Sequence, residues 1–275
     1  PEFLVSMDAA LAGSTAMALG NVVGSNLANM LLIVGVAALL KPIKVKPFVL
    51  LRDTMVLLGS SALFIWFCWL GTVDRKQGGL LLLIMAVFLL RSYWSGFYKG
   101  GVRAENHLEE TKSFEGLKSL RQIWMALLAG SAGVVIGADL IVDGGVEMAQ
   151  VFGVSDEVIG LTVFSIGTSL PELAASVVAA IRGHIDMALG NVVGSNLFNI
   201  LIVAGGVAIV VPLEVPQQII DFDLWLMLLV TVLMLPFFVI GWRIGRVVAV
   251  IFLAVYLAYV IAQAYGISSL VTAFI

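Results

Sequence analysis

The sequence GTSLPE at residues 167–172, followed by GNVVGSNLFN at residues 190–199, decides how the chain folds. It places a carboxylate, hydroxyls, amides, glycines and a proline inside otherwise apolar sequence. An ionisable side chain inside a membrane span costs about 2.5–3.5 kcal/mol on insertion scales, so such a residue marks a functional site by default.

Most of this stretch occurs twice in the chain. Pro1 and Glu2 match Pro171 and Glu172, and the sequence MALGNVVGSNL is identical at residues 17–27 and 187–197. The offset is 170 residues in both cases. The same offset aligns three further pairs: Asn29 with Asn199, Pro42 with Pro212, and Asp53 with Asp223.

Composition places the chain in a membrane. Of its 275 residues, 61% are hydrophobic and 12% are charged, whereas a soluble domain carries about 25% charged residues. The single cysteine, Cys68, excludes an internal disulfide and a cluster of thiolate metal ligands.

Continuous apolar runs without two-residue alternation predict helices rather than barrel strands. Segments near the length of about 20 residues that crosses a bilayer are residues 17–40, 48–70, 78–97, 123–142, 158–181, 187–211, 224–240 and 247–265. Residues 2–11 are long enough for half a bilayer. Because the chain opens with Pro1 and no methionine, we interpret them as the second half of a span that begins upstream. The predicted fold class is an all-α integral membrane protein with eight full spans and a partial one.

Lysine and arginine predict the orientation of these spans. The loops around residues 41–52, 91–122, 182 and 243–246 hold 13 of the 15 basic residues, and the loops that alternate with them hold Arg75 and Lys76. By the positive-inside rule, the basic loops, including the central loop 98–122, are cytoplasmic.

This orientation places the two copies of the motif in opposite directions. The turn at residues 13–16 then lies outside, and the equivalent turn at residues 182–186 lies inside. We therefore predict a first inverted repeat at residues 1–97, truncated at its start, a cytoplasmic loop at 98–122 and a second repeat at 123–275. Inverted repeats are a common plan of secondary transporters, which bind their substrate near the midplane where the repeats meet, although channels also carry repeats.

The motifs offer oxygen ligands on shared helix faces. Thr168 and Ser169 precede Glu172 by four and three residues, which puts their side chains on one stripe. Pro171 has no N–H to donate, and its ring clashes with the carbonyl of Gly167, four residues earlier. The Gly167 carbonyl oxygen is then expected to lack its helical hydrogen bond and to be a further possible ligand. In the next span Asn191, Ser195 and Asn199 are each four residues apart, as are Asn21, Ser25 and Asn29.

All these groups are oxygen donors, which suit hard cations such as Na⁺ and Ca²⁺, whereas zinc and copper prefer nitrogen or sulfur. The two negative charges of the glutamates, one per repeat, can be neutralised by one divalent ion or by two monovalent ions. Such a site suits the exchange of a divalent ion for monovalent ions.

GTSLPE followed by GNxxGSNxxN in inverted repeats resembles the sodium/calcium exchanger family of the calcium:cation antiporter superfamily, in its short bacterial form. The resemblance covers both repeats and the span order. It implies ten spans in the complete protein, with a central cytoplasmic loop, and a metal site formed by the following residues: Glu2, Ser25, Asn29, Thr168, Ser169, Glu172, Ser195 and Asn199.

The resemblance also leaves parts of the site open. The GTS of the first repeat would lie before Pro1, so its share of the site is unassigned. Potassium-dependent members carry Asp at the position of Asn29 or Asn199, so asparagine at both places argues against potassium co-transport. Asn21 and Asn191 could either bind metal or form hydrogen bonds between helices. Because the two roles are equally supported, neither residue is included in the predicted site.

We therefore expect a multi-pass protein of the plasma (inner) membrane that exchanges Na⁺ for Ca²⁺ by alternating access. A proton-coupled cation exchanger remains an alternative, since Glu2 and Glu172 could carry H⁺, and a cation channel is a weaker one. No nucleophile constellation or phosphate-binding loop is present in the sequence, so we expect no enzymatic activity. We also expect no cofactor besides the transported Na⁺ and Ca²⁺, no nucleic-acid partner and no obligate protein partner.

Overall fold

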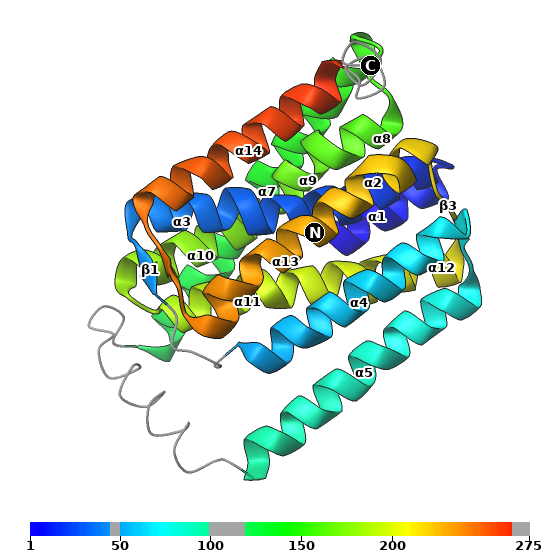
Figure 1. Cartoon of the computed structure of the whole chain (residues 1–275). Coiled ribbons are helices and arrows are strands. Elements are labelled where there is room, and N and C mark those ends of the chain that lie inside the picture. The colour runs from blue at the N-terminus through cyan, green and yellow to red at the C-terminus, as the bar shows by residue number, and fades with distance from the viewer. Residues whose placement is uncertain (45–49, 99–118, 266–275) are drawn as a thin grey trace.

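The computed structural model describes residues 1–44, 50–98 and 119–265, and shows a bundle of long helices (Figure 1). The first half of the chain forms α1 (Glu2–Leu11), α2 (Thr15–Leu27), η1 (Ala28–Ile33), α3 (Val34–Leu40), β1 (Ile43–Lys44), α4 (Leu51–Trp69), β2 (Thr72–Val73) and α5 (Arg75–Tyr98). The second half begins with α7 (Leu120–Val151), α8 (Asp156–Ile159), η2 (Gly160–Phe164), α9 (Ser165–Thr168), α10 (Leu170–Arg182), α11 (Ile185–Phe198), η3 (Asn199–Ala204) and α12 (Gly205–Val210). It ends with β3 (Leu213–Glu214), η4 (Ile219–Asp223), α13 (Leu224–Leu235), η5 (Pro236–Ile240), β4 (Arg243–Ile244) and α14 (Arg246–Tyr265).

The predicted all-α membrane fold is confirmed. Within the described residues, six helices are long and apolar enough to cross a bilayer, and the bent pair Asp156–Thr168 and Leu170–Arg182 makes a seventh. The long helix α7 covers the remaining predicted span, residues 123–142. The middle of the predicted loop 98–122 lies outside the described residues, and the proposed repeat boundaries stay a prediction.

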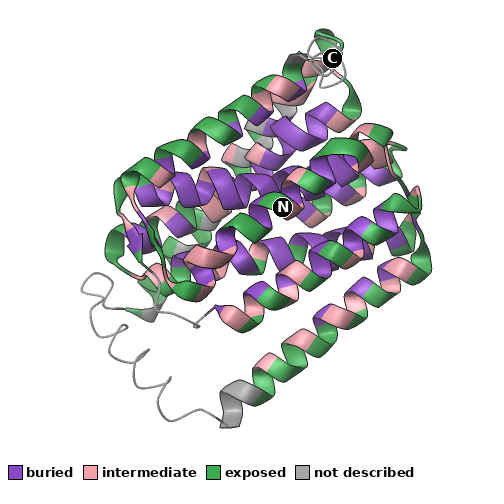
Figure 2. Ribbon diagram, viewed as in Figure 1, coloured by how far each residue is buried: buried purple, intermediate pink, exposed green. Residues whose placement is uncertain are grey.

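The helices differ in whether they face the protein or the lipid. Within their most apolar windows, 83% of Thr15–Leu40 and 67% of Ile185–Val210 are buried, against 17% of Arg75–Trp94 and 22% of Arg246–Ala264. Figure 2 shows the same division, with the buried helices inside the bundle and exposed surface along α5 and α14. Because α5 and α14 expose large apolar side chains such as Leu90 and Leu257, these helices form the lipid-facing surface.

Two short strand pairs show the inverted symmetry. Strand β1 pairs with β4, and β2 pairs with β3, both antiparallel. The 170-residue offset relates β1 to β3 and nearly relates β2 to β4, so each pair is the symmetry counterpart of the other. The pairs lie at opposite ends of the bundle (Figure 1). At the β1 end, Lys41 Nζ also donates to the Ile181 carbonyl at 3.1 Å.

Polar side chains fasten α14 to the start of the neighbouring span. Asp223 is fully buried, and its Oδ1 accepts hydrogen bonds from the Tyr259 hydroxyl at 3.0 Å and from Gln263 Nε2 at 2.5 Å. Gln218 Nε2 in turn donates to Gln263 Oε1 at 2.6 Å. These bonds hold a lipid-facing helix against the bundle where apolar packing in lipid supplies little attraction.

Glycines bring α2 against η2 closer than side chains would allow. A Cβ at Gly24 would lie 2.4 Å from the Leu161 carbonyl oxygen, and a Cβ at Gly160 would lie 2.3 Å from that of Met17. The GxxxG pattern at Gly20 and Gly24 therefore forms a backbone-to-backbone contact, which allows close helix packing. The equivalent glycine in the second repeat, Gly194, has no described atom within 4 Å of its Cβ position.

Replacing Gly24 by alanine is expected to destabilise the protein, because the new methyl group meets backbone rather than a movable side chain. Overpacking of this kind costs about 1–3 kcal/mol. The thermal unfolding midpoint of the detergent-solubilised protein measures the effect. Gly59→Ala is the matched control, since a Cβ at Gly59 meets nothing within 4 Å. Equal midpoints for the two variants would contradict the close contact.

Candidate functional site

The GTSLPE segment breaks a membrane span into two helices, α9 and α10. The two halves of this span meet at a bend of 45°. Ser169 lies between them with φ −86° and ψ 3°, and Pro171 stands in the first turn of α10. The helix is therefore interrupted next to Pro171, and the freeing of the Gly167 carbonyl stays a prediction. The interruption places the side chains of Thr168 and Ser169, 1% and 2% exposed, deep in the protein.

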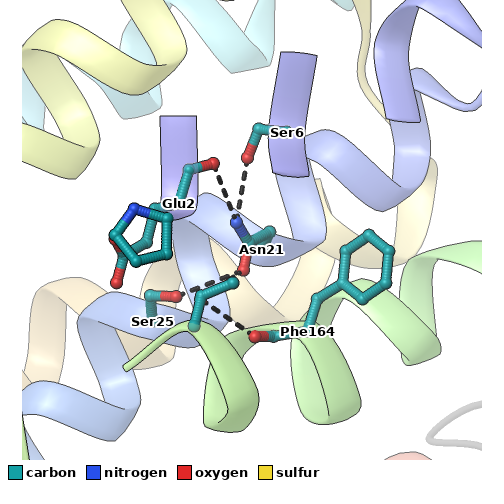
Figure 3. Close-up of polar contacts among 7 residues, drawn as sticks. Glu2, Ser6, Asn21, Ser25 and Phe164 are labelled. Atoms are coloured by element: carbon teal, nitrogen blue, oxygen red, sulfur yellow. Dashed lines mark hydrogen bonds and ion pairs between the residues drawn. The ribbon is translucent and has the colours of Figure 1, made fainter. Parts of the chain in front are cut away.

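Asn21 on α2 connects both repeats in one hydrogen-bonded cluster (Figure 3). Its Nδ2 donates to Ser6 Oγ at 2.9 Å and to the Glu2 carbonyl at 3.4 Å. Its Oδ1 lies within accepting distance of two hydroxyls, Ser25 at 3.3 Å and Thr168 at 3.2 Å. The Thr168 hydroxyl is also 2.9 Å from the Phe164 carbonyl. Asn21 therefore orients three of the residues predicted to bind metal.

The second repeat contains counterparts of the two bonds donated by Asn21 Nδ2. Asn191 Nδ2 donates to Ser176 Oγ at 3.0 Å and to the Glu172 carbonyl at 3.4 Å. The 170-residue offset relates each of these residues to its counterpart around Asn21. Asn21 and Asn191 thus form hydrogen bonds between helices, which was one of the two roles considered for them. Each also binds the backbone carbonyl of the glutamate in its own repeat.

Glu2 begins α1 and Glu172 lies in the first turn of α10, and Asn21 and Asn191 bind their backbone carbonyls. Glu2 is 5% exposed and Glu172 is half-buried. Among the described residues, Glu172 Oε2 is buried without a hydrogen-bond partner. Two carboxylates in such a position call for a positive charge between them.

Other oxygens at the predicted site are also buried without partners among the described residues. They are Ser169 Oγ and Asn29 Oδ1. Buried polar atoms are nearly always satisfied, so three orphaned oxygens on predicted ligands indicate a bound species that accepts electron pairs. No group of three or more His, Cys, Asp and Glu side chains in the described part of the chain could hold a metal ion. Hydroxyl, amide and backbone oxygens would therefore complete any coordination shell, as hard cations prefer.

The remaining predicted ligands lie on the second-repeat helix. Ser195 is half-buried on α11, and Asn199 is 1% exposed at the start of η3. Asn29, at the equivalent place in η1, donates through Nδ2 to Asn196 Oδ1 at 2.8 Å. The structure thus joins Glu2, Ser25 and Thr168 through Asn21, and joins Asn29 to the opposite repeat. The assignment of all eight residues as metal ligands stays a prediction.

Sequence reasoning missed two features of this region. The first is the set of hydrogen bonds that Asn26 and Asn196 make beside the predicted ligands. Their adjacency to Ser25 and Ser195 in the duplicated GSN motif could have drawn attention to them. The second is the wider π-helical turn in each repeat, η1 and η3, where a regular α-helix was expected. Such turns shift the face on which following residues lie and are frequent at functional sites.

The chain matches known proteins over nearly its whole length. The family model described as sodium/calcium exchanger protein matches residues 1–94 and 122–265. A putative antiporter, CaxA, of Alkalimonas amylolytica is 38% identical over 94% of this chain and 82% of its own length. The sodium/calcium exchanger MaX1 of Methanosarcina acetivorans is 33% identical over 96% of this chain and 85% of its own length.

A solved structure has the same fold. The sodium-calcium exchanger NCX_Mj, soaked with Na⁺ and Ca²⁺, superposes with a TM-score of 0.72 at 30% sequence identity, over 96% of this chain and 81% of that one. Together with the duplicated motif and the inverted strand pairs, these matches show that the chain belongs to the sodium/calcium exchanger family of membrane antiporters.

Proposed function

We propose that this protein is a secondary active antiporter that exchanges Na⁺ for Ca²⁺ across a membrane by alternating access. The observation that carries the proposal is the placement of unpartnered oxygens of Ser169, Glu172 and Asn29 in the buried zone where the two repeats meet. Glu2, which Asn21 links to Thr168 of the other repeat, adds a second carboxylate. Up to two negative charges can be neutralised by one Ca²⁺ or by Na⁺ ions.

We further propose the coordination set. Glu2 and Glu172 would be the central ligands of the transported ions. Hydroxyl or amide oxygens would complete the site, contributed by Ser25, Asn29, Thr168, Ser169, Ser195 and Asn199. Asn21 and Asn191 would orient the glutamates by binding the backbone carbonyls of Glu2 and Glu172. The ions are cargo, and the mechanism needs no covalent step and no cofactor.

The orientation in the membrane is also part of the proposal. The basic residues Lys41, Arg182 and Arg243 belong to segments that gather at the β1–β4 end of the bundle. The acidic residues Asp156 and Glu214 mark the other end, where Ser14 donates to Asp156 and Thr15 donates to the Glu214 carbonyl. By the positive-inside rule, the β1–β4 end and loop 98–122 face the cytoplasm of a plasma or inner membrane.

Replacing Glu172 by glutamine is expected to abolish Ca²⁺ transport, because the amide retains the size of the side chain but removes a negative charge from the site. Loss of a buried charged partner costs at least about 2 kcal/mol, which is more than tenfold in affinity. The measurement is ⁴⁵Ca²⁺ uptake into Na⁺-loaded proteoliposomes diluted into Na⁺-free buffer. Glu214→Gln is the control, since Glu214 is an exposed residue of β3. Wild-type uptake by the Glu172→Gln variant would remove Glu172 from the site.

The coupling ion is tested by changing the gradient while keeping the protein constant. Ca²⁺ uptake is expected to follow an outward Na⁺ gradient, to saturate with Ca²⁺ and to be unchanged when K⁺ is added. Uptake that follows a pH gradient instead would establish the proton-coupled alternative, in which Glu2 and Glu172 exchange H⁺. Uptake that needs no counter-ion and does not saturate would indicate a channel.

A further inference from the structure

Four asparagines lie where the two repeats cross. Asn26 and Asn29 come from the first repeat, and Asn196 and Asn199 are their counterparts at the 170-residue offset. Each of the four is at most 2% exposed. Asn29 and Asn199 belong to the proposed ion site, whereas Asn26 and Asn196 lie beside it and are not proposed as ligands.

The hydrogen bonds among these asparagines do not obey the symmetry of the repeats. Asn29 Nδ2 donates to Asn196 Oδ1 at 2.8 Å, and Asn196 Nδ2 donates to the Asn26 carbonyl at 3.4 Å. The symmetry counterpart of the first bond would join Asn199 Nδ2 to Asn26 Oδ1. Those two atoms are both buried and have no partner in the described structure.

The Asn26 side chain makes a different bond instead. Its Nδ2 donates to the Val22 carbonyl one turn back on its own helix, at 2.7 Å. Asn196 thus reaches across to the opposite repeat, while Asn26 folds back along α2. A change of side-chain rotamer at both residues would exchange these roles and would satisfy the donor and the acceptor that are now without partners.

Other contacts do obey the symmetry. The Nδ2 bonds of Asn21 and Asn191 have matching partners and distances, and the strand pairs are symmetry counterparts. The bonds from Ser25 and Thr168 to Asn21 Oδ1, by contrast, have no counterpart at Asn191 among the described residues. Low exposure of all four asparagines excludes solvent as the reason for the difference. Because buried polar atoms without partners are costly, an unmade bond with both its atoms in place indicates a second arrangement of the same side chains.

We propose that Asn26 and Asn196 are positioning residues that form a two-state switch between the repeats. In the state seen here, Asn196 holds the amide nitrogen of Asn29, which fixes the side chain and leaves Asn29 Oδ1 free to bind an ion. In the opposite state, Asn26 holds Asn199 in the same way, and Asn196 folds back onto the Val192 carbonyl. The inference rests on the proposed antiport function, because it assigns the two arrangements to the two directions in which the site opens.

The chemistry of the switch suits its position. All its members are neutral amides, so the exchange moves no charge through the bundle and needs neither a proton nor an ion. A set of hydrogen bonds with two discrete arrangements can couple the two repeats, because a bond made in one arrangement prevents its counterpart. Each state then presents one firmly held ligand asparagine.

The test compares Asn26→Ala with Asn196→Ala and with the double variant. The reporter is the rate at which Met17→Cys reacts with a polar thiol reagent in the detergent-solubilised protein, with Cys68 replaced by alanine. Met17 is 6% exposed where α2 meets η2, while its counterpart Met187 is 58% exposed and supplies a fast-reacting reference as Met187→Cys. The state seen here therefore protects position 17, and we take loss of that protection as the sign of the opposite state.

Asn196→Ala removes the bond that stabilises the present state, and the reaction at position 17 is expected to accelerate about fivefold, the ratio that follows from losing one typical hydrogen bond. Asn26→Ala removes the acceptor of the opposite state and is expected to leave the reaction slow or slow it further. The double variant removes both bonds, and its reaction at position 17 is expected to return toward the rate of the protein that keeps both asparagines. In transport assays from one side of the membrane, the two single variants should shift the KM for Ca²⁺ in opposite directions.

Several outcomes would overturn the switch. These are acceleration by both single variants, a double variant that reacts as fast as Asn196→Ala alone, or unchanged labelling in all three. Asn196→Ser, which keeps a smaller polar group, replaces the alanine variant if that variant does not fold, and the same direction is expected. A protein without Na⁺-driven Ca²⁺ uptake would refute the proposed function, whereas the labelling result would still decide whether the two arrangements exist.

Discussion

The structure depends on keeping two carboxylates inside an apolar bundle. Burial of Glu2 and Glu172 makes each charge costly unless it is balanced. The chain accepts this cost by surrounding the pair with hydroxyls and amides rather than with basic side chains. A basic side chain would neutralise the charge permanently, whereas an exchangeable cation can neutralise it in each state and leave again.

The inverted repeat follows from the same requirement. A site that must open to either side is most simply made from two copies of one unit with opposite orientations. The copies supply matching glutamates, and Asn21 and Asn191 bind the glutamate carbonyls at the same distance of 3.4 Å. The lipid-facing helices α5 and α14 enclose the site without contributing a predicted ligand. Their exposed apolar surfaces suit the bilayer.

Much of the fold could be predicted from residues alone. Each predicted span coincides with a helix or a broken helix, because about 20 apolar residues leave the backbone few alternatives in lipid. The break near Pro171 was predictable for the same reason, since proline cannot donate the helical hydrogen bond. The π-helical turns were not predictable, because residues such as Asn29 and Asn199 are compatible with either helix type and the packing of neighbouring helices selects between them.

For the site, the sequence by itself determined the chemical type of the groups and their duplication. The identical stretches around Asn21 and Asn191 could only produce equivalent oxygen-rich places, whatever the details of packing. Tertiary structure alone decided which amide bonds to which partner. Asn26 and Asn196 occupy identical sequence contexts, yet one folds back on its own helix and the other crosses to the opposite repeat. Identical neighbours in sequence cannot distinguish them, because the choice is made by the relative placement of two helices that lie 170 residues apart in the chain.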